Sequence, residues 1–246
     1  MKWFKYALLL LLITYPANAG MKMIGGGLGG VVAVGGLATI TADVYADGSA
    51  TDTVTVAIDP TNGLSNRMAF VVVGWEKGGS AGAISSVTYD GNACVNIDTQ
   101  TFVDGTYNGT ALYYCDETDI VDDDSANVVV TPDAAFYVSA LVKIYYNVAQ
   151  QAPVDTDKDT GTDDQCDTSV TTAENGSLVI SGISNVTSTN AQAPDQGDEL
   201  GMESYYQTTD MGSIIDDVAG AQAFNWSLDA AETHGCISAA FSPAAL

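Results

Sequence analysis

The sequence predicts an all-β protein, folded as a sandwich of antiparallel sheets. Short runs rich in Val, Ile, Thr, Tyr and Phe alternate with clusters of Gly, Asn, Asp and Ser, which is the pattern of strands and turns. No long segment repeats its apolar residues with the period of a helix. Strands that follow one another without helical crossovers favour antiparallel sheets. The chain has 246 residues, 46% of them hydrophobic, which fits one β-rich domain with a filled core.

About ten strands are expected. The pattern is clearest at 136–146, where Phe136 and Val138 begin one face while Tyr137 and Ser139 begin the other, the period-two alternation of a half-buried strand. In chain order the expected strands are 52–58, 67–75, 84–89, 93–103, 109–115, 126–131, 136–146, 177–183, 221–228 and 235–241.

The first residues predict export from the cell. Residues 1–19 combine a basic start, an apolar run over 6–13 and an Ala-Asn-Ala cleavage site at 17–19, the layout of a secretory signal peptide. An uncleaved membrane anchor is the alternative, although the apolar run is short for a membrane span. We therefore expect a secreted protein, extracellular or on the cell surface, with no stable membrane span after cleavage.

A Gly-rich apolar arm is expected at 20–42, followed by a single sandwich domain at 43–246. The arm carries no charge from Met23 to Ala42. An exposed apolar segment usually marks an interaction site, so we expect the arm to add a strand to a neighbouring copy, a contact that builds filaments. A membrane span and a disordered or self-packed arm are the alternatives. The apolar residues expected to make the contacts are Ile24, Leu28, Val31, Val32, Val34 and Leu37.

The order of several strand sequences resembles that of a known group of proteins. The runs RMAFVVVGWE, ISSVTYDG, TALYYCDETD and FYVSALVKIYYNV resemble those of secreted and phage-associated β-sandwich modules with a jelly-roll-like fold. The resemblance covers about residues 52–243. It implies a jelly-roll-like sandwich and a role on a cell surface or appendage, and it brings no catalytic residues with it.

The charge balance excludes several functions. Seven Lys and Arg stand against 31 Asp and Glu, a formal charge of −24, which excludes unaided binding to nucleic acid or an anionic membrane. The single histidine, His234, is expected in a turn or at the surface and leaves no Ser-His-Asp triad. The Gly-rich stretch lacks the Lys-Ser/Thr ending of a phosphate loop. We expect no enzymatic activity, with glycoside cleavage by loop carboxylates as the alternative.

One acidic segment is a candidate calcium site. Five aspartates surround Gly161 in a segment expected to be a loop, and calcium prefers six to eight oxygen ligands. The alternative is a solvated acidic loop that binds no ion. A second acidic block lies at 116–124. The candidate calcium ligands are Asp155, Asp157, Asp159, Asp163 and Asp164.

The four cysteines are expected to form two disulfides in an oxidising compartment. A hairpin with a two-residue turn at 104–105 would place Cys94 directly opposite Cys115, close enough to bridge. A competing turn at 108–109 would break this register. By elimination, Cys166 then pairs with Cys236. Four glycosylation sequons are also present, at Asn108, Asn175, Asn185 and Asn225.

Together these features predict a non-enzymatic structural subunit whose copies form an extracellular filament, coat or appendage. The alternative is a calcium-dependent carbohydrate-binding or adhesion module that binds surface glycans through exposed aromatic side chains.

Overall fold

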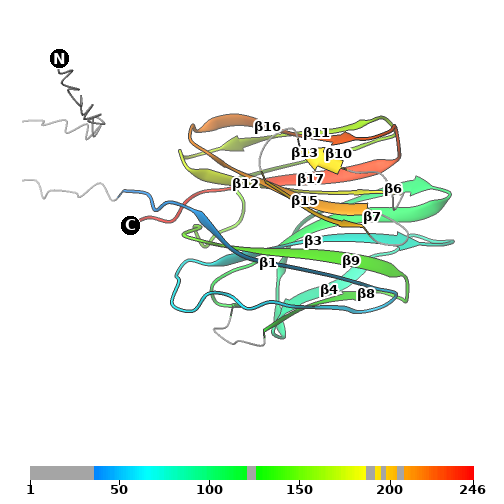
Figure 1. Cartoon of the computed structure of the whole chain (residues 1–246), viewed down its shortest axis with the longest axis horizontal. Coiled ribbons are helices and arrows are strands. Elements are labelled where there is room, and N and C mark those ends of the chain that lie inside the picture. Colours follow the sequence, from blue (N-terminus) through cyan, green and yellow to red (C-terminus); the bar gives the residue numbers. More distant parts are fainter. Residues whose placement is uncertain (1–35, 121–125, 187–191, 195–197, 204–207) are drawn as a thin grey trace, which may run out of the picture. The chain divides into compact units, whose positions relative to one another are not determined.

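In the computed structural model, residues 36–120, 126–186, 192–194, 198–203 and 208–246 are described, and every regular element among them is a β-strand (Figure 1). None of these elements is an apolar helix that could cross a membrane. The predicted all-β fold is confirmed. Each of the ten expected strands is present, and the total exceeds ten.

The strands form two successive sets along the chain. The first set is β1 (Thr41–Ala50), β2 (Val54–Ala57), β3 (Met68–Lys77), β4 (Ile84–Tyr89), β5 (Asn92–Ala93), β6 (Val95–Asp104), β7 (Thr106–Cys115), β8 (Asn127–Pro132) and β9 (Tyr137–Tyr146). The second set is β10 (Asp155–Gly161), β11 (Gln165–Thr172), β12 (Ser177–Asn185), β13 (Gln192–Pro194), β14 (Asp198–Glu203), β15 (Thr208–Asp216), β16 (Gly220–Leu228) and β17 (His234–Phe241).

Each set folds into two sheets whose strands pair antiparallel. In the first set, inner sheet 1 has the order β1-β9-β3-β7-β6 and outer sheet 1 has the order β2-β8-β4-β5. In the second set, inner sheet 2 has the order β10-β17-β12-β15-β14 and outer sheet 2 has the order β11-β16-β13. In both sets the chain passes back and forth between its two sheets, as in a jelly roll.

The two sets have the same topology. With β5 left out, the strands match in chain order: β1 to β4 match β10 to β13, and β6 to β9 match β14 to β17. This matching gives identical strand orders in the two inner sheets and in the two outer sheets. The short strand β5 has no counterpart among the described residues of the second set. The segment Gly35–Leu246, which is one compact unit, therefore contains two jelly rolls in tandem within the region predicted as a single sandwich.

The sheets are stacked in four layers, separated by three hydrophobic cores (Figure 1). The first core fills the space between outer and inner sheet 1, the second lies between the two inner sheets, and the third fills the second jelly roll. Domains commonly have two or three layers. The additional layer corrects one prediction: β9 is buried on both faces, since Val138 faces the first core and Leu141 the second.

The two inner sheets approach each other closely at Gly182 in β12. A Cβ atom at this position would lie 2.6 Å from the methyl groups of Val72 in β3. Real Cβ contacts are not this short, so a larger residue at 182 would have to separate the sheets or displace Val72. Glycine at this position therefore permits the face-to-face packing of the two jelly rolls.

The chain enters the first jelly roll beside its own C-terminus. Leu37 forms a bridge with Ala245, and the N–H of Ala38 donates to the carbonyl of Ala244 at 2.8 Å. Ile40 is buried in the second core. The segment predicted as an arm, 20–42, thus overlaps the folded unit from residue 36 onward. The predicted signal peptide and the arm residues Ile24, Leu28, Val31, Val32 and Val34 lie outside the described residues.

Candidate functional site

A groove opens where the chain crosses from outer sheet 1 to inner sheet 1. Its volume is about 410 Å³. One wall is the start of β4, residues 84–87, and the other is formed by β6 and β7. The lining residues on these walls and in the crossover are Ile84, Ser85, Ser86, Val87, Ala93, Cys94, Asn96, Thr99 and Tyr113.

Strand β4 has an open edge along this groove. On one side β4 pairs with β8 along its length, with a bulge between Ile84 and Ser86. On the other side β5 pairs only with Thr88 and Tyr89, and the N–H of Cys94 donates to the carbonyl of Val87 at 2.9 Å. In the part of the chain that the structure describes, no strand pairs with residues 84–86 on this side. Such an edge can accept another strand.

The disulfide Cys94–Cys115 holds the crossover next to the groove. It joins the residue after β5 to the last residue of β7, with a Cα–Cα distance of 4.5 Å. Because Cys115 is buried in the first core, the bond fixes the start of β6 beside β7, its neighbour in inner sheet 1. The chain beyond Cys94 is therefore held away from the open edge of β4.

Both predicted disulfides are confirmed, although the predicted hairpin register is only partly right. Gly105, with φ +71°, lies alone between the paired residues Asp104 and Thr106. The register near the tip is consequently shifted by one residue from the predicted one, and a bulge between Asn96 and Asp98 restores the predicted register beyond it. Cys94 reaches Cys115 because the bulge compensates for the shorter turn.

The second disulfide, Cys166–Cys236, joins the two sheets of the second jelly roll. Its Cα atoms are 6.3 Å apart, and it links β11 in outer sheet 2 with β17 in inner sheet 2 through the third core.

The groove carries no charged group, in contrast to the rest of this acidic protein. All of its lining residues are uncharged. Tyr113 is buried, which raises the pKa of its phenol above the ordinary value, and a hydrogen bond with Asn96 opposes this shift. The phenol therefore stays neutral in the physiological range. A neutral segment can enter this groove without an unpaired charge being buried.

The segment predicted to be a calcium-binding loop is largely a strand. Asp155, Asp157 and Asp159 project from β10, the edge strand of inner sheet 2, toward β11. We call these three residues the carboxylate ladder. The loop prediction was wrong at these positions because the alternation of aspartates reflects the two faces of a strand.

Each carboxylate of the ladder accepts two backbone hydrogen bonds. One oxygen accepts the N–H of the next residue in β10, at 2.8–2.9 Å. The other oxygen accepts an N–H from β11, and the three donors are Thr171 at 2.7 Å, Ser169 at 2.8 Å and Asp167 at 3.2 Å. The carboxylate ladder therefore joins β10, at the edge of inner sheet 2, to β11, at the edge of outer sheet 2, by side-chain hydrogen bonds in place of backbone pairing.

Calcium binding stays a prediction. Residues two apart in a strand are separated by about 6.6–6.8 Å, so the ladder does not gather its oxygens around one point. Asp163 and Asp164 lie in the exposed turn after β10. Among the described residues, no group of three or more His, Cys, Asp or Glu is arranged to hold a metal ion.

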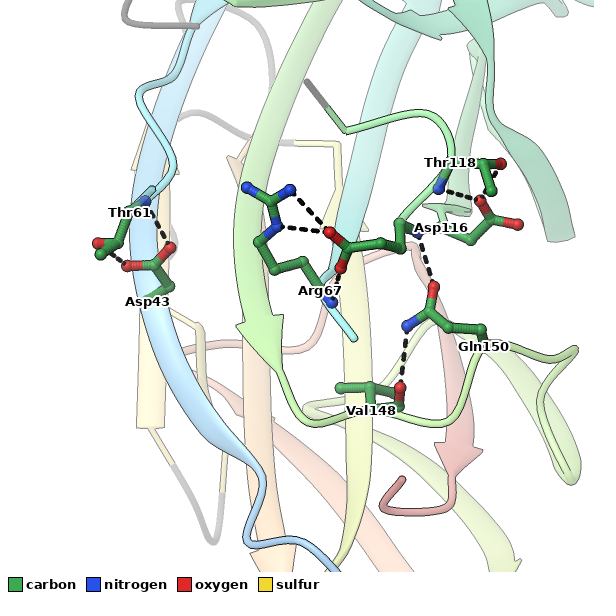
Figure 2. A network of polar contacts seen from close by, with 8 residues as sticks. Asp43, Thr61, Arg67, Asp116, Thr118, Val148 and Gln150 are labelled. Carbon is green, nitrogen blue, oxygen red and sulfur yellow. Dashed lines mark hydrogen bonds and ion pairs between the residues drawn. The ribbon is translucent and has the colours of Figure 1, made fainter. Parts of the chain in front are cut away.

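The second acidic block takes part in a network of polar contacts that ties the first jelly roll to the segment between β9 and β10 (Figure 2). Arg67 is buried, and its Nε and Nη2 lie 3.0 and 2.7 Å from Oε1 of Glu117. The N–H of Glu117 donates to Oε1 of Gln150 at 2.6 Å, and Nε2 of Gln150 donates to the carbonyl of Val148 at 2.9 Å. Glu117 thus joins the loop after β7 to the segment between β9 and β10. Residues 121–125 of this block lie outside the described part.

His234 is buried, which corrects the surface position expected for it. The side chain at the start of β17 has no exposed area, and its Nδ1 lies 2.8 Å from the carbonyl oxygen of Glu232. Its Nε2 faces the exposed carboxylate of Asp163 at 3.8 Å. A single imidazole in this position provides no nucleophile–base pair.

The sequons differ in their accessibility. Asn108 and Asn185 are buried within β7 and β12, and Nδ2 of Asn108 donates to the carbonyl of Thr106 at 3.2 Å. Asn175 is exposed in the turn before β12, and Asn225 is half-buried in β16. Only the last two could carry a glycan without disturbing the folded strands.

Most described aromatic side chains belong to the cores. Trp75, Trp226 and Tyr145 are almost completely buried. Tyr45 and Tyr107 are the exposed large aromatics of the described chain, at 38% and 37% exposure, and they lie on β1 and β7. A continuous aromatic surface for stacking on sugar rings is therefore not assembled by these residues.

Comparisons with protein-family models, with curated proteins and with solved structures find no match for this chain. The class that its own geometry defines is a protein of two tandem jelly rolls, each closed by an internal disulfide.

Proposed function

We propose that this chain is an extracellular structural subunit without enzymatic activity, whose copies assemble through the apolar N-terminal arm. The arm of one copy would bind the next copy in a filament, coat or appendage. Residues Met23–Ala42 carry no charge in a protein with a formal charge of −24, and this contrast is the observation that carries the proposal. The charge of the body favours solubility, whereas burial of the apolar arm against another surface is energetically favourable.

The architecture of the body supports this proposal. Two disulfides are typical of proteins in oxidising compartments, and they fasten each jelly roll internally. The carboxylates of the ladder and of Glu117 accept hydrogen bonds from backbone and side-chain groups of the same chain. These bonds fasten the strands and loops of the body to one another. The arm joins the body next to the C-terminus, where Leu37 and Leu246 are 43% and 82% exposed. Apolar surface at this junction would be covered on assembly.

Removal of the arm tests the proposal. Three forms of the mature protein are compared by analytical ultracentrifugation and electron microscopy: the intact chain, a variant without residues 20–35, and a variant in which these residues are replaced by a Gly-Ser sequence of equal length. We expect the intact chain to assemble and both variants to be monomers with unchanged melting temperatures. Assembly of either variant, or an intact chain that stays monomeric at every concentration, would overturn the proposal.

A further inference from the structure

The groove beside β4 has the geometry of a strand acceptor. In the first jelly roll the chain leaves outer sheet 1 after the two residues of β5 and continues as β6 in inner sheet 1. Residues 84–86 of β4 consequently keep an open edge at the groove, with Ser85 and Ser86 exposed and Ile84 half-buried. An incoming strand would extend the pairing that the N–H of Cys94 begins at the carbonyl of Val87.

The Cys94–Cys115 disulfide keeps this acceptor from closing on itself. An unpaired edge could be satisfied by the chain's own β6 if its first residues moved toward β4. Cys115 is anchored in the first core and Cys94 is bonded to it, so this rearrangement would break the bond or the core packing. The disulfide thereby preserves an open edge that the fold could otherwise lose.

The chemistry of the groove selects an uncharged, small-residue strand. Val87 and Tyr113 provide buried apolar surface, while Ser86, Asn96 and Thr99 provide short polar side chains. With no charge in the lining, an acidic or basic peptide would have no ion-pair partner there. A strand rich in Gly, Ala and Val can lie against both the backbone edge and the apolar wall.

The N-terminal arm of a second copy fits these requirements, and it is the occupant we infer; this inference rests on the proposed function. We infer that part of residues 20–35 inserts as a strand beside residues 84–86 of a neighbouring copy. The segment of 16 residues spans up to about 53 Å when extended, whereas the three-residue edge needs about 10 Å. It holds Gly, Val, Ala and Leu and has no charge after Lys22. Enough chain is therefore available to reach from one body to the next.

A charge placed in the groove tests the inference separately from the function. Ser86 is exposed and lines the groove, so Ser86→Glu should leave the fold intact and would bury a carboxylate under an inserted strand. Ser49→Glu is the matched control, because Ser49 is an exposed residue of another edge strand, β1. We expect Ser86→Glu to stay monomeric and Ser49→Glu to assemble as the parent does.

A synthetic peptide of residues 20–36 provides the second measurement. Added to the protein that lacks residues 20–35, it should bind and protect the backbone N–H groups of residues 84–86 from hydrogen exchange. Ser86→Glu should weaken this binding about tenfold or more, since an unpaired charge would become buried. Equal melting temperatures of the two Glu variants verify that both are folded.

The outcomes separate the two proposals. If arm deletion abolishes assembly while Ser86→Glu assembles normally, or if the peptide protects another strand, the groove is not the acceptor and the proposed function stands. If the deletion variant still assembles, the proposed function itself fails. If the intact monomer already shows protection at 84–86, the arm occupies its own groove, and the second-copy assignment is overturned.

Discussion

Replacing Asp157 by alanine should destabilise the second jelly roll by removing the middle rung of the carboxylate ladder. Oδ2 of Asp157 accepts the N–H of Ser169 in β11 at 2.8 Å, and Oδ1 accepts the N–H of Lys158 at 2.9 Å. Alanine would leave both N–H groups to water. The neighbouring rungs at Asp155 and Asp159 would remain, so the expected change is a loss of stability rather than unfolding.

The magnitude follows from the exposure of the rung. Hydrogen bonds to charged groups contribute about 1.5–3 kcal/mol when both partners are shielded, and neutral ones about 0.5–1.5 kcal/mol. Because Ser169 is exposed and Asp157 half-buried, water replaces part of each bond, and we expect a loss of about 1–2 kcal/mol in the free energy of unfolding. For a domain of this size that corresponds to roughly 2–8 °C in melting temperature.

The removed charge itself acts in the opposite direction and needs a control. Loss of one carboxylate relieves repulsion in a protein with a formal charge of −24. Asp52→Ala removes the same charge from an exposed position before β2, and its effect is subtracted. Urea unfolding of both variants, together with Asp157→Asn, measures the difference. The asparagine retains one oxygen for the N–H of Ser169 and should recover at least half of the loss. An Asp157→Ala protein as stable as Asp52→Ala would refute the role of the ladder.

Four further outcomes are expected. Gly182→Ala should cost about 1–3 kcal/mol because its methyl group meets Val72, whereas Gly78→Ala, which meets no atom within 4 Å, should be nearly neutral; equal urea midpoints would contradict the close packing of the inner sheets. Burial and then the nearby charge of Asp116 raise the pKa of Asp119 in the folded protein, so the free energy of unfolding falls as the pH rises through this raised pKa. Asp119→Asn should therefore raise the melting temperature at pH 7, where Asp119 is ionised, and leave it unchanged near pH 3. Loss of the disulfide that closes the longer loop, with a separation of 70 residues, should cost about 1 kcal/mol more than loss of the other, whose separation is 21, as measured by chemical denaturation of the two double Cys→Ser proteins. If the acidic turn binds calcium, the melting temperature should be higher in calcium than in chelator, and equal values would end that prediction.

The sequence predicted the strands that are rich in β-branched residues and failed at those whose buried face is polar. Strand β11 alternates buried and exposed residues throughout, but two of its inward positions are threonines. Thr168 is buried because its hydroxyl lies 2.6 Å from that of Ser238, a partner from β17. Such a pairing is not local in sequence, so the segment resembled a polar loop. In β10 the alternation of aspartates was itself a signal of a strand.

The stacking of the two jelly rolls was also beyond sequence reasoning. Alternation in 136–146 correctly separates the two faces of β9, but both faces are buried because a second sandwich covers the side that includes Leu141. Matched strands have different sequences, as in β3 (MAFVVVGWEK) and β12 (SLVISGISN), so the shared strand order was not apparent from the sequence. The groove beside β4 depends on where β6 changes sheets, and Cys94, placed between two strands, was its only trace in the sequence.

The tandem arrangement imposes a delay during synthesis. The first jelly roll is complete at Tyr146, but the last strand of the sheet that covers it is β17, which ends at Phe241. Translation of the intervening chain of about 100 residues takes roughly 5–20 s at typical rates. During that interval Phe70 and Leu141 have no native cover, and transiently exposed apolar surface of this kind makes unfinished chains prone to associate. Nascent chains on neighbouring ribosomes of one messenger RNA would therefore associate through their first jelly rolls. A chain that ends near residue 150 should accordingly be recovered as a dimer or an aggregate.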